Sequence, residues 1–571
     1  MSRLFTSLRS FLPFLGWFPL SRASLRADLF AGLSVAVVLI PQALAYAQLA
    51  GLPPHFGLYA ALVPTIVGAL FGSCPQLSTG PVAMSSLLSY AVLTDLNLAP
   101  CPSEQFNNLA VILAGLAGLI LLAVGVFKLT IVINFISHPA IMGFTNAGAI
   151  IIALSQLGKL VGIDQPRTGF YLHDVLSTLA RLHHSHLPTL AFGLLSLTTL
   201  LILKQLCPRC PGVLIVVVVA TLISSLCGFN TRWHGDIVGH IPPGFPPISL
   251  PKVSWELVVR LFPGAATVAL IGFMETAAVC KSISAHTRQR LHLRQEVIAQ
   301  GLAKLAGFFT SSYTTSGSLS RSALNWYCGA KTGLSSLIAA ATVALTLLFL
   351  TPLLYHLPIA VLAAIIIVAV LQLLNLPAMH RIWQADPLDG VTAWVTFAAC
   401  LLLAPKIAEG ILVGIVLALG FHLYRIMRPN VAILAPHPDG TYRDGDRHRL
   451  PFLDDIIPLR FEGRLCFANA EHFELSLLDA LSRFPRARAV IVVADGINAI
   501  DASGEEKLRE IFFHLRETGI LLTVAEAKWR VLDVLTRTGL YHLIGPDNFF
   551  RSVDQAVSAL RARLAPPPSP T

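Results

Sequence analysis

The chain has 571 residues, of which 54% are hydrophobic and only 13% charged, and its mean hydropathy is +0.69. Soluble globular proteins carry about 25% charged residues, so this composition excludes an ordinary soluble enzyme and a nucleic-acid-binding protein. Residues 1–429 hold 24 Lys or Arg and 12 Asp or Glu, whereas residues 430–571 hold 17 and 19. The net charge of +10 is therefore +12 on the apolar part and −2 on the remainder, which predicts a membrane domain followed by a soluble one.

Three regions follow from this distribution. Residues 1–26 are predicted to be a cytoplasmic N-terminal segment, and residues 27–428 a transmembrane domain. Residues 429–571 are predicted to be a cytoplasmic soluble domain with a short linker and a proline-rich tail. The basic excess of the apolar part fits a membrane protein, because Lys and Arg accumulate in cytoplasmic loops.

The sequence carries no motif of catalysis or metal binding. Its nine cysteines are scattered, and Cys207 and Cys210 lack the second pair that a zinc site needs. No nucleophile elbow, phosphate-binding loop or metal-ligand spacing occurs. We therefore expect that the protein is not an enzyme and that it has no catalytic residue, no metal and no cofactor.

Fourteen segments are candidates for membrane spans, each of which needs about 20 mostly apolar residues. They are residues 29–49, 56–71, a short span from Pro81, 109–126, 139–157, 187–203, 212–228, 261–279, 297–310, a short span from about 318, 333–351, 358–374, 391–404 and 407–424. Basic residues concentrate in the loops after even-numbered spans. This bias places both ends of the chain in the cytoplasm.

The third and tenth spans are interrupted in the same way. Residues 78–83 (Ser-Thr-Gly-Pro-Val-Ala) open the third, and residues 317–323 (Gly-Ser-Leu-Ser-Arg-Ser-Ala) open the tenth. Matching interruptions in two halves indicate a seven-plus-seven inverted repeat with a binding site near the midplane. The alternative is that Gly and Ser only allow close helix packing.

Arg321 lies in the first turn of the tenth span. An Arg at membrane depth is costly, about 2.5–3.5 kcal/mol on insertion scales, and marks a functional site by default. A helix N-terminus attracts anions through its free N–H groups and its dipole. Arg321 beside such an end therefore predicts an anion site, with an Arg reaching for the membrane surface as the alternative.

Glu275 is the only charged residue between Leu261 and Cys280. An isolated carboxyl group in an apolar helix is either protonated or paired. Near Arg321 it could ionise when substrate is absent and take up a proton when an anion arrives. We expect a proton-coupling role, and the alternative is a structural hydrogen bond between spans.

At these residues the sequence resembles the sulfate permease (SulP) family of inorganic anion transporters over nearly its whole length. The resemblance implies core and gate domains, an elevator-like motion, and an anion held between the N-termini of the third and tenth spans. It also implies a coupling role for Glu275, and the pocket residues that it implies are Gln42, Tyr46, Val82, Ala83, Ser318, Ser320 and Arg321. The matching segments are Ile40-Pro41-Gln42-Ala43-Leu44-Ala45-Tyr46-Ala47, Phe56-Gly57-Leu58-Tyr59, residues 79–83, Ser137-His138-Pro139, Gly143-Phe144-Thr145, Thr287-Arg288-Gln289 and residues 317–323.

Two positions depart from the family pattern. Many members have an Arg where this chain has Pro75, and some have a larger side chain at Val82. The second departure bears on the size of the pocket and on which anion fits it.

The C-terminal region alternates strand and helix patterns, which indicates a small α/β domain. A strand and turn are expected over residues 459–469, buried strands over 489–494 and 520–524, and a helix over 504–518. The region is similar to the STAS domain of these transporters. Ser503 occupies the position phosphorylated in related anti-sigma-factor antagonists, and the alternative is that Ser503 only caps the helix.

The sequence therefore predicts a secondary active transporter of inorganic anions, with sulfate as substrate and proton symport as the driving reaction. The alternatives are an anion exchanger, a sodium-coupled bicarbonate or dicarboxylate transporter, and an anion channel. The expected partners are the anion, protons, the lipid bilayer of the cell inner membrane, a second copy of the chain, and cytoplasmic regulators at the STAS domain. No nucleic-acid partner is expected.

Overall fold

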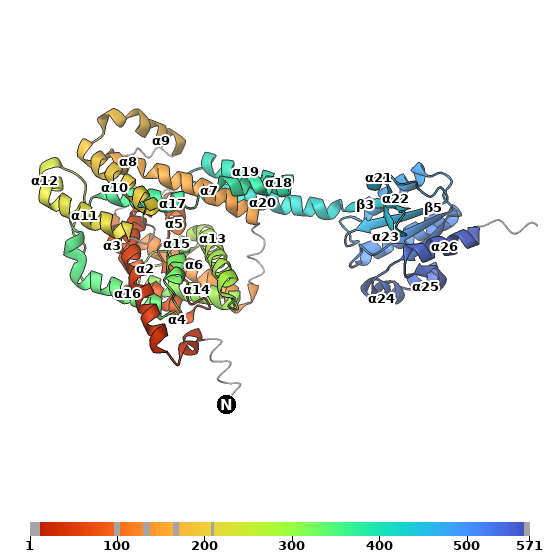
Figure 1. Cartoon of the computed structure of the whole chain (residues 1–571), viewed down its shortest axis with the longest axis horizontal. Coiled ribbons are helices and arrows are strands. Elements are labelled where there is room, and N and C mark those ends of the chain that lie inside the picture. The colour runs from red at the N-terminus through yellow and green to blue at the C-terminus, as the bar shows by residue number, and fades with distance from the viewer. Residues whose placement is uncertain (1–11, 96–102, 130–136, 164–170, 207–210, 565–571) are drawn as a thin grey trace, which may run out of the picture. The chain divides into compact units, whose positions relative to one another are not determined.

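The computed structural model describes residues 12–95, 103–129, 137–163, 171–206 and 211–564. The chain divides into two compact units, Met1–Ala418 and Leu419–Thr571. The first is almost entirely helical, and the second contains a six-stranded sheet with helices (Figure 1). Cys207 and Cys210, like residues 1–11 and the tail from 565 to 571, lie outside the described residues.

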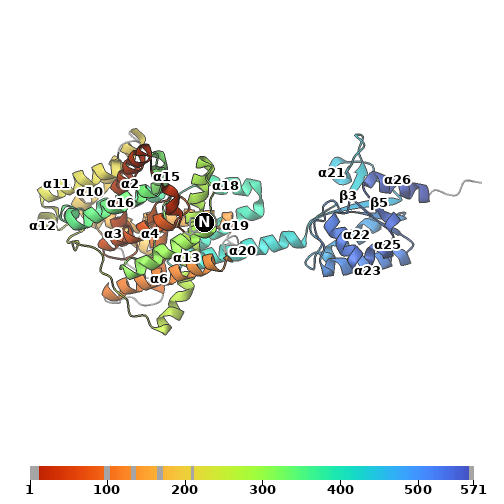
Figure 2. The same cartoon turned by 90° about the horizontal axis from the view of Figure 1, so that it is seen from below.

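Every span expected from the sequence coincides with a helix or with two consecutive helices (Figure 2). The helices of the apolar part are α2 (Arg22–Leu49), α3 (His55–Ala60), α4 (Val63–Phe71), α5 (Ala83–Asp95), α6 (Ser103–Val126), α7 (His138–Ser155), α8 (Leu157–Val161), α9 (Tyr171–Ala180), α10 (Leu187–Leu206), α11 (Gly212–Cys227), α12 (Phe229–Trp233), α13 (Trp255–Thr287), α14 (Leu293–Phe309), α15 (Leu319–Tyr327), α16 (Leu334–Leu345), α17 (Ile359–Leu371), α18 (Leu376–Ala385), α19 (Pro387–Leu402) and α20 (Ile407–Met427). The short helices α9, α12 and α18 were not expected.

Among the described residues, 8 helical stretches are long and apolar enough to cross a membrane. Four shorter apolar stretches, His55–Phe71, Ala83–Thr94, Gly212–Cys227 and Pro387–Leu402, supplement them. The helices α14 and α15 belong to neither set, because they are short and carry charged residues inside the protein. The total of fourteen spans stays a prediction.

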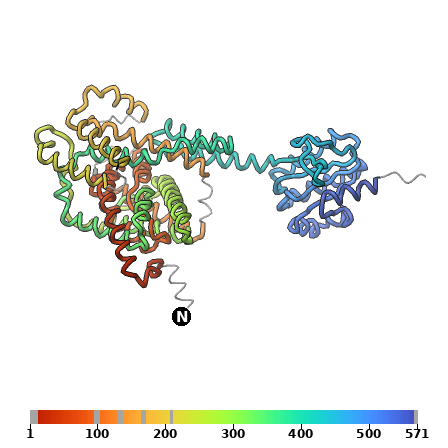
Figure 3. Tube along the Cα trace, viewed as in Figure 1, coloured from red at the N-terminus to blue at the C-terminus, as the bar shows by residue number. Residues whose placement is uncertain are grey.

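Helices from the two halves of the sequence pack against each other. In the first unit α14 lies against α4 and α6, α16 lies against α2, and α19 lies against α7. Figure 3 shows the corresponding red and orange segments running beside green ones. This packing between the halves agrees with the predicted inverted repeat, whose binding site lies where the two repeats meet.

The second unit is a mixed sheet of order β4-β3-β5-β6-β7-β8. The strand β3 is antiparallel to β4 and β5, whereas β5 to β8 run parallel. Strands expected near residues 459, 489 and 520 are confirmed. The strands are β3 (Asn430–Pro436), β4 (Tyr442–Asp444), β5 (Ile456–Glu462), β6 (Ala489–Val493), β7 (Leu521–Ala525) and β8 (Phe549–Phe550).

Helices cover both faces of this sheet. One face packs on α22 (Ala470–Arg483), α23 (Ala502–Glu517) and α24 (Trp529–Arg537) through residues such as Phe461, Phe473 and Leu535. The other packs on α26 (Val553–Leu564). All five residues of β6 are buried because the strand lies between two helical layers.

We expect residues 429–564 to fold as a soluble fragment, since their sheet has its own core on each face. A fragment that begins at 440 lacks β3 and should be markedly less stable, because β3 pairs with both β4 and β5. Urea unfolding of the two fragments measures this difference. Leu434→Ala, which removes a side chain that is 2% exposed, should cost about 2–5 kcal/mol of unfolding free energy. Equal stability of the two fragments would contradict the assignment of β3 to the fold.

Candidate functional site

Two short strands cross where the sequence predicted two interrupted spans. β1 (Thr79–Gly80) and β2 (Ser316–Gly317) are antiparallel, with Thr79 opposite Gly317. The amide of Ser318 also donates to the carbonyl of Ser78 at 3.0 Å. The helix α5 begins three residues after β1 ends, and α15 begins two residues after β2 ends. The crossing therefore brings two helix N-termini together inside the protein.

Neutral side chains pair with several backbone and hydroxyl groups of this crossing. Residues 76–89 and 311–318 are buried throughout, so water cannot pair with their backbone. Helices α4, α13, α14 and α15 supply the partners instead. The bonds are Thr65 Oγ1 to the Thr79 carbonyl (2.8 Å), Gly317 N to Thr276 Oγ1 (2.9 Å), Gln300 Nε2 to Thr79 Oγ1 (2.9 Å) and Ser78 N to Ser322 Oγ (2.8 Å).

Arg321 is the third residue of α15 and is completely buried. Its Nε donates to Ser78 Oγ at 3.3 Å, and its Nη1 donates to Gln42 Oε1 at 3.4 Å. Its buried Nη2 has no hydrogen-bond partner among the described residues. That nitrogen lies so close to Gly80 that an added Cβ there would be only 3.2 Å away. Arg321 therefore does not reach for the membrane surface, and this alternative is wrong. Its Nη2 is a donor nitrogen without a partner among the described residues.

The structure places Gln42 and Tyr46 near this guanidinium, and Val82, Ala83 and Ser318 where the two half-helices begin. Gln42 and Tyr46 are one turn apart on α2 and are 5% and 4% exposed. Val82 and Ala83 are buried where α5 begins. Ser318 caps α15, and its Oγ accepts from the Arg321 amide at 3.5 Å.

Ser320 differs from the other predicted pocket residues. It is exposed, although its neighbour Arg321 is buried, because successive helical residues point in different directions. Its hydroxyl lies 3.5 Å from that of Ser318. The structure therefore connects Ser320 to the site through Ser318.

Glu275 is half-buried on α13, the helix that packs against α5, β2 and α15. Its Oε2 is buried and has no hydrogen-bond partner within the described ranges. The carboxyl group interacts electrostatically with Arg321 and with Lys304. The expected proximity of Glu275 and Arg321 is therefore present.

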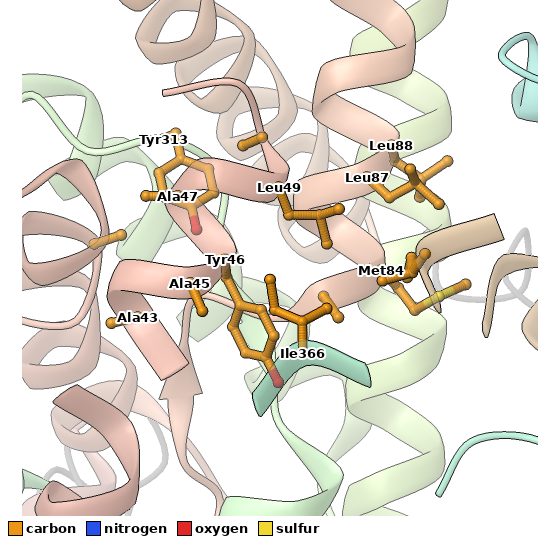
Figure 4. Close-up of a cluster of buried hydrophobic side chains, with 14 of the residues drawn as sticks. Ala43, Ala45, Tyr46, Ala47, Leu49, Met84, Leu87, Leu88, Tyr313 and Ile366 are labelled. Carbon is orange, nitrogen blue, oxygen red and sulfur yellow. The ribbon is translucent and has the colours of Figure 1, made fainter. Parts of the chain in front are cut away.

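Lys304 and Tyr313 are members of the site that the sequence analysis missed. Lys304 on α14 is 2% exposed, and its Nζ donates to the carbonyl of Thr315, the residue before β2. The one signal for Lys304 was its position as the only charged residue in the expected span 297–310. Tyr313 shares a 3.2 Å hydrogen bond with Ser86. Figure 4 shows Tyr313 and Tyr46 among buried apolar side chains.

Two further buried carboxylates hold the loops that flank the half-helices. Asp28 accepts from the Lys331 amide at 2.7 Å and from the Thr332 amide and hydroxyl at 3.1 and 2.6 Å. Glu296 accepts from the amide and hydroxyl of Ser73 at 2.9 and 3.0 Å. These anchors fix the chain after α15 and before β1.

The described residues contain no group of three or more His, Cys, Asp or Glu side chains that could hold a metal ion.

Ser503 lies one residue inside α23, which begins at Ala502 rather than at the expected residue 504. The cap is Asp501, whose Oδ1 accepts from the Gly504 amide at 2.9 Å. The capping alternative for Ser503 is therefore wrong, because an Asp two residues earlier takes that position. The Ser503 side chain is exposed in the first turn of the helix.

Comparisons with known proteins assign both parts of the chain to families. Residues 25–396 match the sulfate permease family, and residues 449–556 match the STAS domain. The chain is 33% identical over 556 residues to the probable sulfate transporter 4.2 of Arabidopsis thaliana, covering 93% of this chain and 80% of that protein. It is 31% identical over 560 residues to a probable sulfate transporter of Mycobacterium tuberculosis, covering 96% and 99%.

Solved structures share the fold. The inward-facing murine solute carrier 26 family member A9, an anion transporter, has a TM-score of 0.89 at 25% identity, covering 98% of this chain and 95% of that one. The transmembrane domain of a cyanobacterium bicarbonate transporter has a TM-score of 0.60 at 22% identity, covering 70% and 99%. The second likeness concerns the fold alone.

Arg321→Ala should weaken anion binding by at least about tenfold, because a hydrogen bond to a charged group contributes about 1.5–3 kcal/mol. Isothermal titration of the purified protein with sulfate measures the affinity, and size-exclusion chromatography checks folding. Lys331→Gln removes an exposed cation from the loop after α15 and is the matched control. Wild-type affinity in a folded Arg321→Ala variant would exclude Arg321 from the site.

Proposed function

Since the chain belongs to the sulfate permease family, we propose that it is a secondary active transporter of inorganic anions that takes up sulfate by proton symport. The observation that carries the proposal is the free Nη2 of buried Arg321, which lies where two half-helices begin. A buried donor without a partner is costly, and an anion would supply the missing acceptor.

The anion would lie between the N-termini of α5 and α15. The first N–H groups of an α-helix have no partner within that helix, and each N-terminus carries about half a positive charge. Gln42, Tyr46, Val82, Ala83 and Ser318 would form the wall around it, with Ser320 at its exposed side. Sulfate suits such a site because its oxygens accept from backbone amides and from the guanidinium at once.

Glu275 would carry the coupled proton. Its free carboxylate oxygen lies in the field of Arg321, which favours the ionised form while no anion is bound. A bound anion neutralises that field, so the carboxyl group then takes up a proton. Substrate and proton would enter together for this electrostatic reason.

The hydrogen bonds of the crossing support an elevator-like motion. They join α4, α13, α14 and α15 into one body around the two half-helices. The helices α7 and α19 pack on each other, and so do α10 and α17. We propose that the first group is the core domain, which carries the anion, and that the second belongs to the gate domain.

Uptake of labelled sulfate into proteoliposomes tests the proposal against its alternatives. Accumulation against a gradient when only a proton gradient is imposed supports symport, and passive equilibration alone would indicate a channel. Uptake that requires an internal counter-anion would indicate an exchanger. Uptake that follows sodium and ignores the pH gradient would indicate sodium coupling.

The remaining proposals concern the cellular setting. Basic loops after even-numbered spans support cytoplasmic termini, and we propose residence in the cell inner membrane as a homodimer. The STAS domain would bind cytoplasmic regulators. Exposed Ser503 in the first turn of α23 is the proposed phosphorylation site, because a helix N-terminus stabilises a phosphate group.

Glu275→Gln should bind sulfate with little pH dependence and should block proton-driven uptake, because the amide is always neutral. In the wild type, lower pH should tighten sulfate binding, since proton and anion then favour each other reciprocally. The measurement is sulfate affinity against pH for both forms. A wild-type affinity that is flat between about pH 5 and 8, where a perturbed carboxyl group would titrate, would show that Glu275 is structural.

A further inference from the structure

Lys304 is a buried cation to which the proposed transport cycle gives no role. It lies within α14 and is 2% exposed. Its Nζ donates to the carbonyl of Thr315, one residue before β2. A buried ammonium group is costly unless charged or polar groups compensate it. Its charge therefore acts on the same crossing that presents Arg321.

Glu275 is the carboxyl group that acts electrostatically on Lys304. The carboxyl group interacts with both Lys304 and Arg321. Of the helices packed on α14, α4 carries no charged residue and α6 carries only Glu104 in its first turn. Glu296, two turns earlier on α14, is bound to Ser73.

The tyrosine side chains beside these charged groups do not change the net charge of the site. Tyr46 and Tyr313 both interact electrostatically with Arg321, and phenols are neutral at physiological pH. The local charge is therefore set by two cations, Lys304 and Arg321, and by one carboxyl group, Glu275.

These three groups give the site two charge states. Their formal sum is +1 when Glu275 is ionised and +2 when it is protonated. Sulfate is a dianion, whereas chloride and nitrate are monoanions. Uncompensated charge is costly away from water. The site with protonated Glu275 therefore matches the charge of sulfate, and the site with ionised Glu275 matches the charge of a monoanion.

From this match we infer that Lys304 determines the charge of the anion that the site prefers, and that without its ammonium group the site prefers monoanions. The inference rests on the proposed function, because it assigns a substrate class to the same anion site. Lys304 acts here through the charge of the site and through its bond to the Thr315 carbonyl, as a residue that determines specificity.

Lys304→Met tests the inference in the full-length protein, because Met has a similar shape and no charge. Titration calorimetry at pH 5 gives the ratio of sulfate affinity to chloride affinity. We expect Lys304→Met to lower that ratio by about tenfold or more, which corresponds to about 1.4 kcal/mol. Lys304→Arg should keep the wild-type ratio because it keeps the charge. An unchanged ratio in Lys304→Met would overturn the inference.

Arg294→Gln is the matched control on the same helix. Arg294 donates to the Gly125 carbonyl at 2.9 Å, away from the crossing, so its loss should leave the ratio unchanged. A fall in this control as large as that in Lys304→Met would overturn the inference, since the effect would then not depend on the buried site. A wild type that binds no anion would instead refute the proposed function.

A second pair of variants tests the inference if Lys304→Met does not fold. Glu275→Gln fixes the charge of the site at +2, and the double variant with Lys304→Met fixes it at +1 without leaving an unpaired carboxylate. The double variant should show the lower sulfate preference. In the wild type itself, the sulfate preference should rise as pH falls. Equal ratios in the two variants, or a wild-type preference independent of pH, would overturn the inference.

Discussion

The constraint on which the rest of the structure depends is that polar groups inside a membrane must find their partners within the protein. The chain breaks two helices at membrane depth, which exposes backbone groups that a continuous helix would pair. Strands β1 and β2 solve this problem by pairing with each other, and neutral side chains such as Thr65 and Thr276 complete the set. Because each break satisfies the other, the two half-helices are necessarily adjacent, and their N-termini face a common region.

Much of this arrangement could be predicted from the sequence. The two interruptions are local signals, because Gly, Pro and Ser break helices wherever they cluster. Arg321 and Glu275 stand out because each is a single charge in a long apolar stretch. Insertion of such a residue into a membrane costs free energy, so its presence indicates a functional site. Eight long apolar helices and four shorter ones follow from hydropathy within the described residues, whereas α14 and α15 do not. The succession of an apolar helical part and a charged α/β part follows from the charge distribution.

Other features depend on contacts that no local pattern reveals. Lys304 escaped notice because its partners are a backbone carbonyl at Thr315 and a carboxyl group 29 residues earlier, Glu275. The burial of Arg321 and the exposure of adjacent Ser320 depend on which face of α15 meets α2. In the STAS domain, Asp501 and Ser503 are both of residue types that cap helices well. The position at which α23 begins shows that Asp501 is the cap. Tertiary packing, rather than propensity, settled each of these cases.

Neutral groups make several of the bonds that hold the site together. Thr65, Gln300 and Thr276 attach β1 and β2 to α4, α14 and α13 through neutral groups, whereas Lys304 of α14 bonds the Thr315 carbonyl through its charged ammonium group. Two charged atoms of the site, Arg321 Nη2 and Glu275 Oε2, have no hydrogen-bond partner in the described part of the chain, and neither do neutral atoms such as Ser85 Oγ and Thr314 Oγ1.

Bonds between neutral groups depend less on protonation and ligand state than bonds between charges do. The dehydrated interior strengthens every interaction between the charges. Substitutions of the neutral groups should therefore act on folding. Substitutions of the charges should act on which ion binds and at what pH, so that one scaffold can carry different anions.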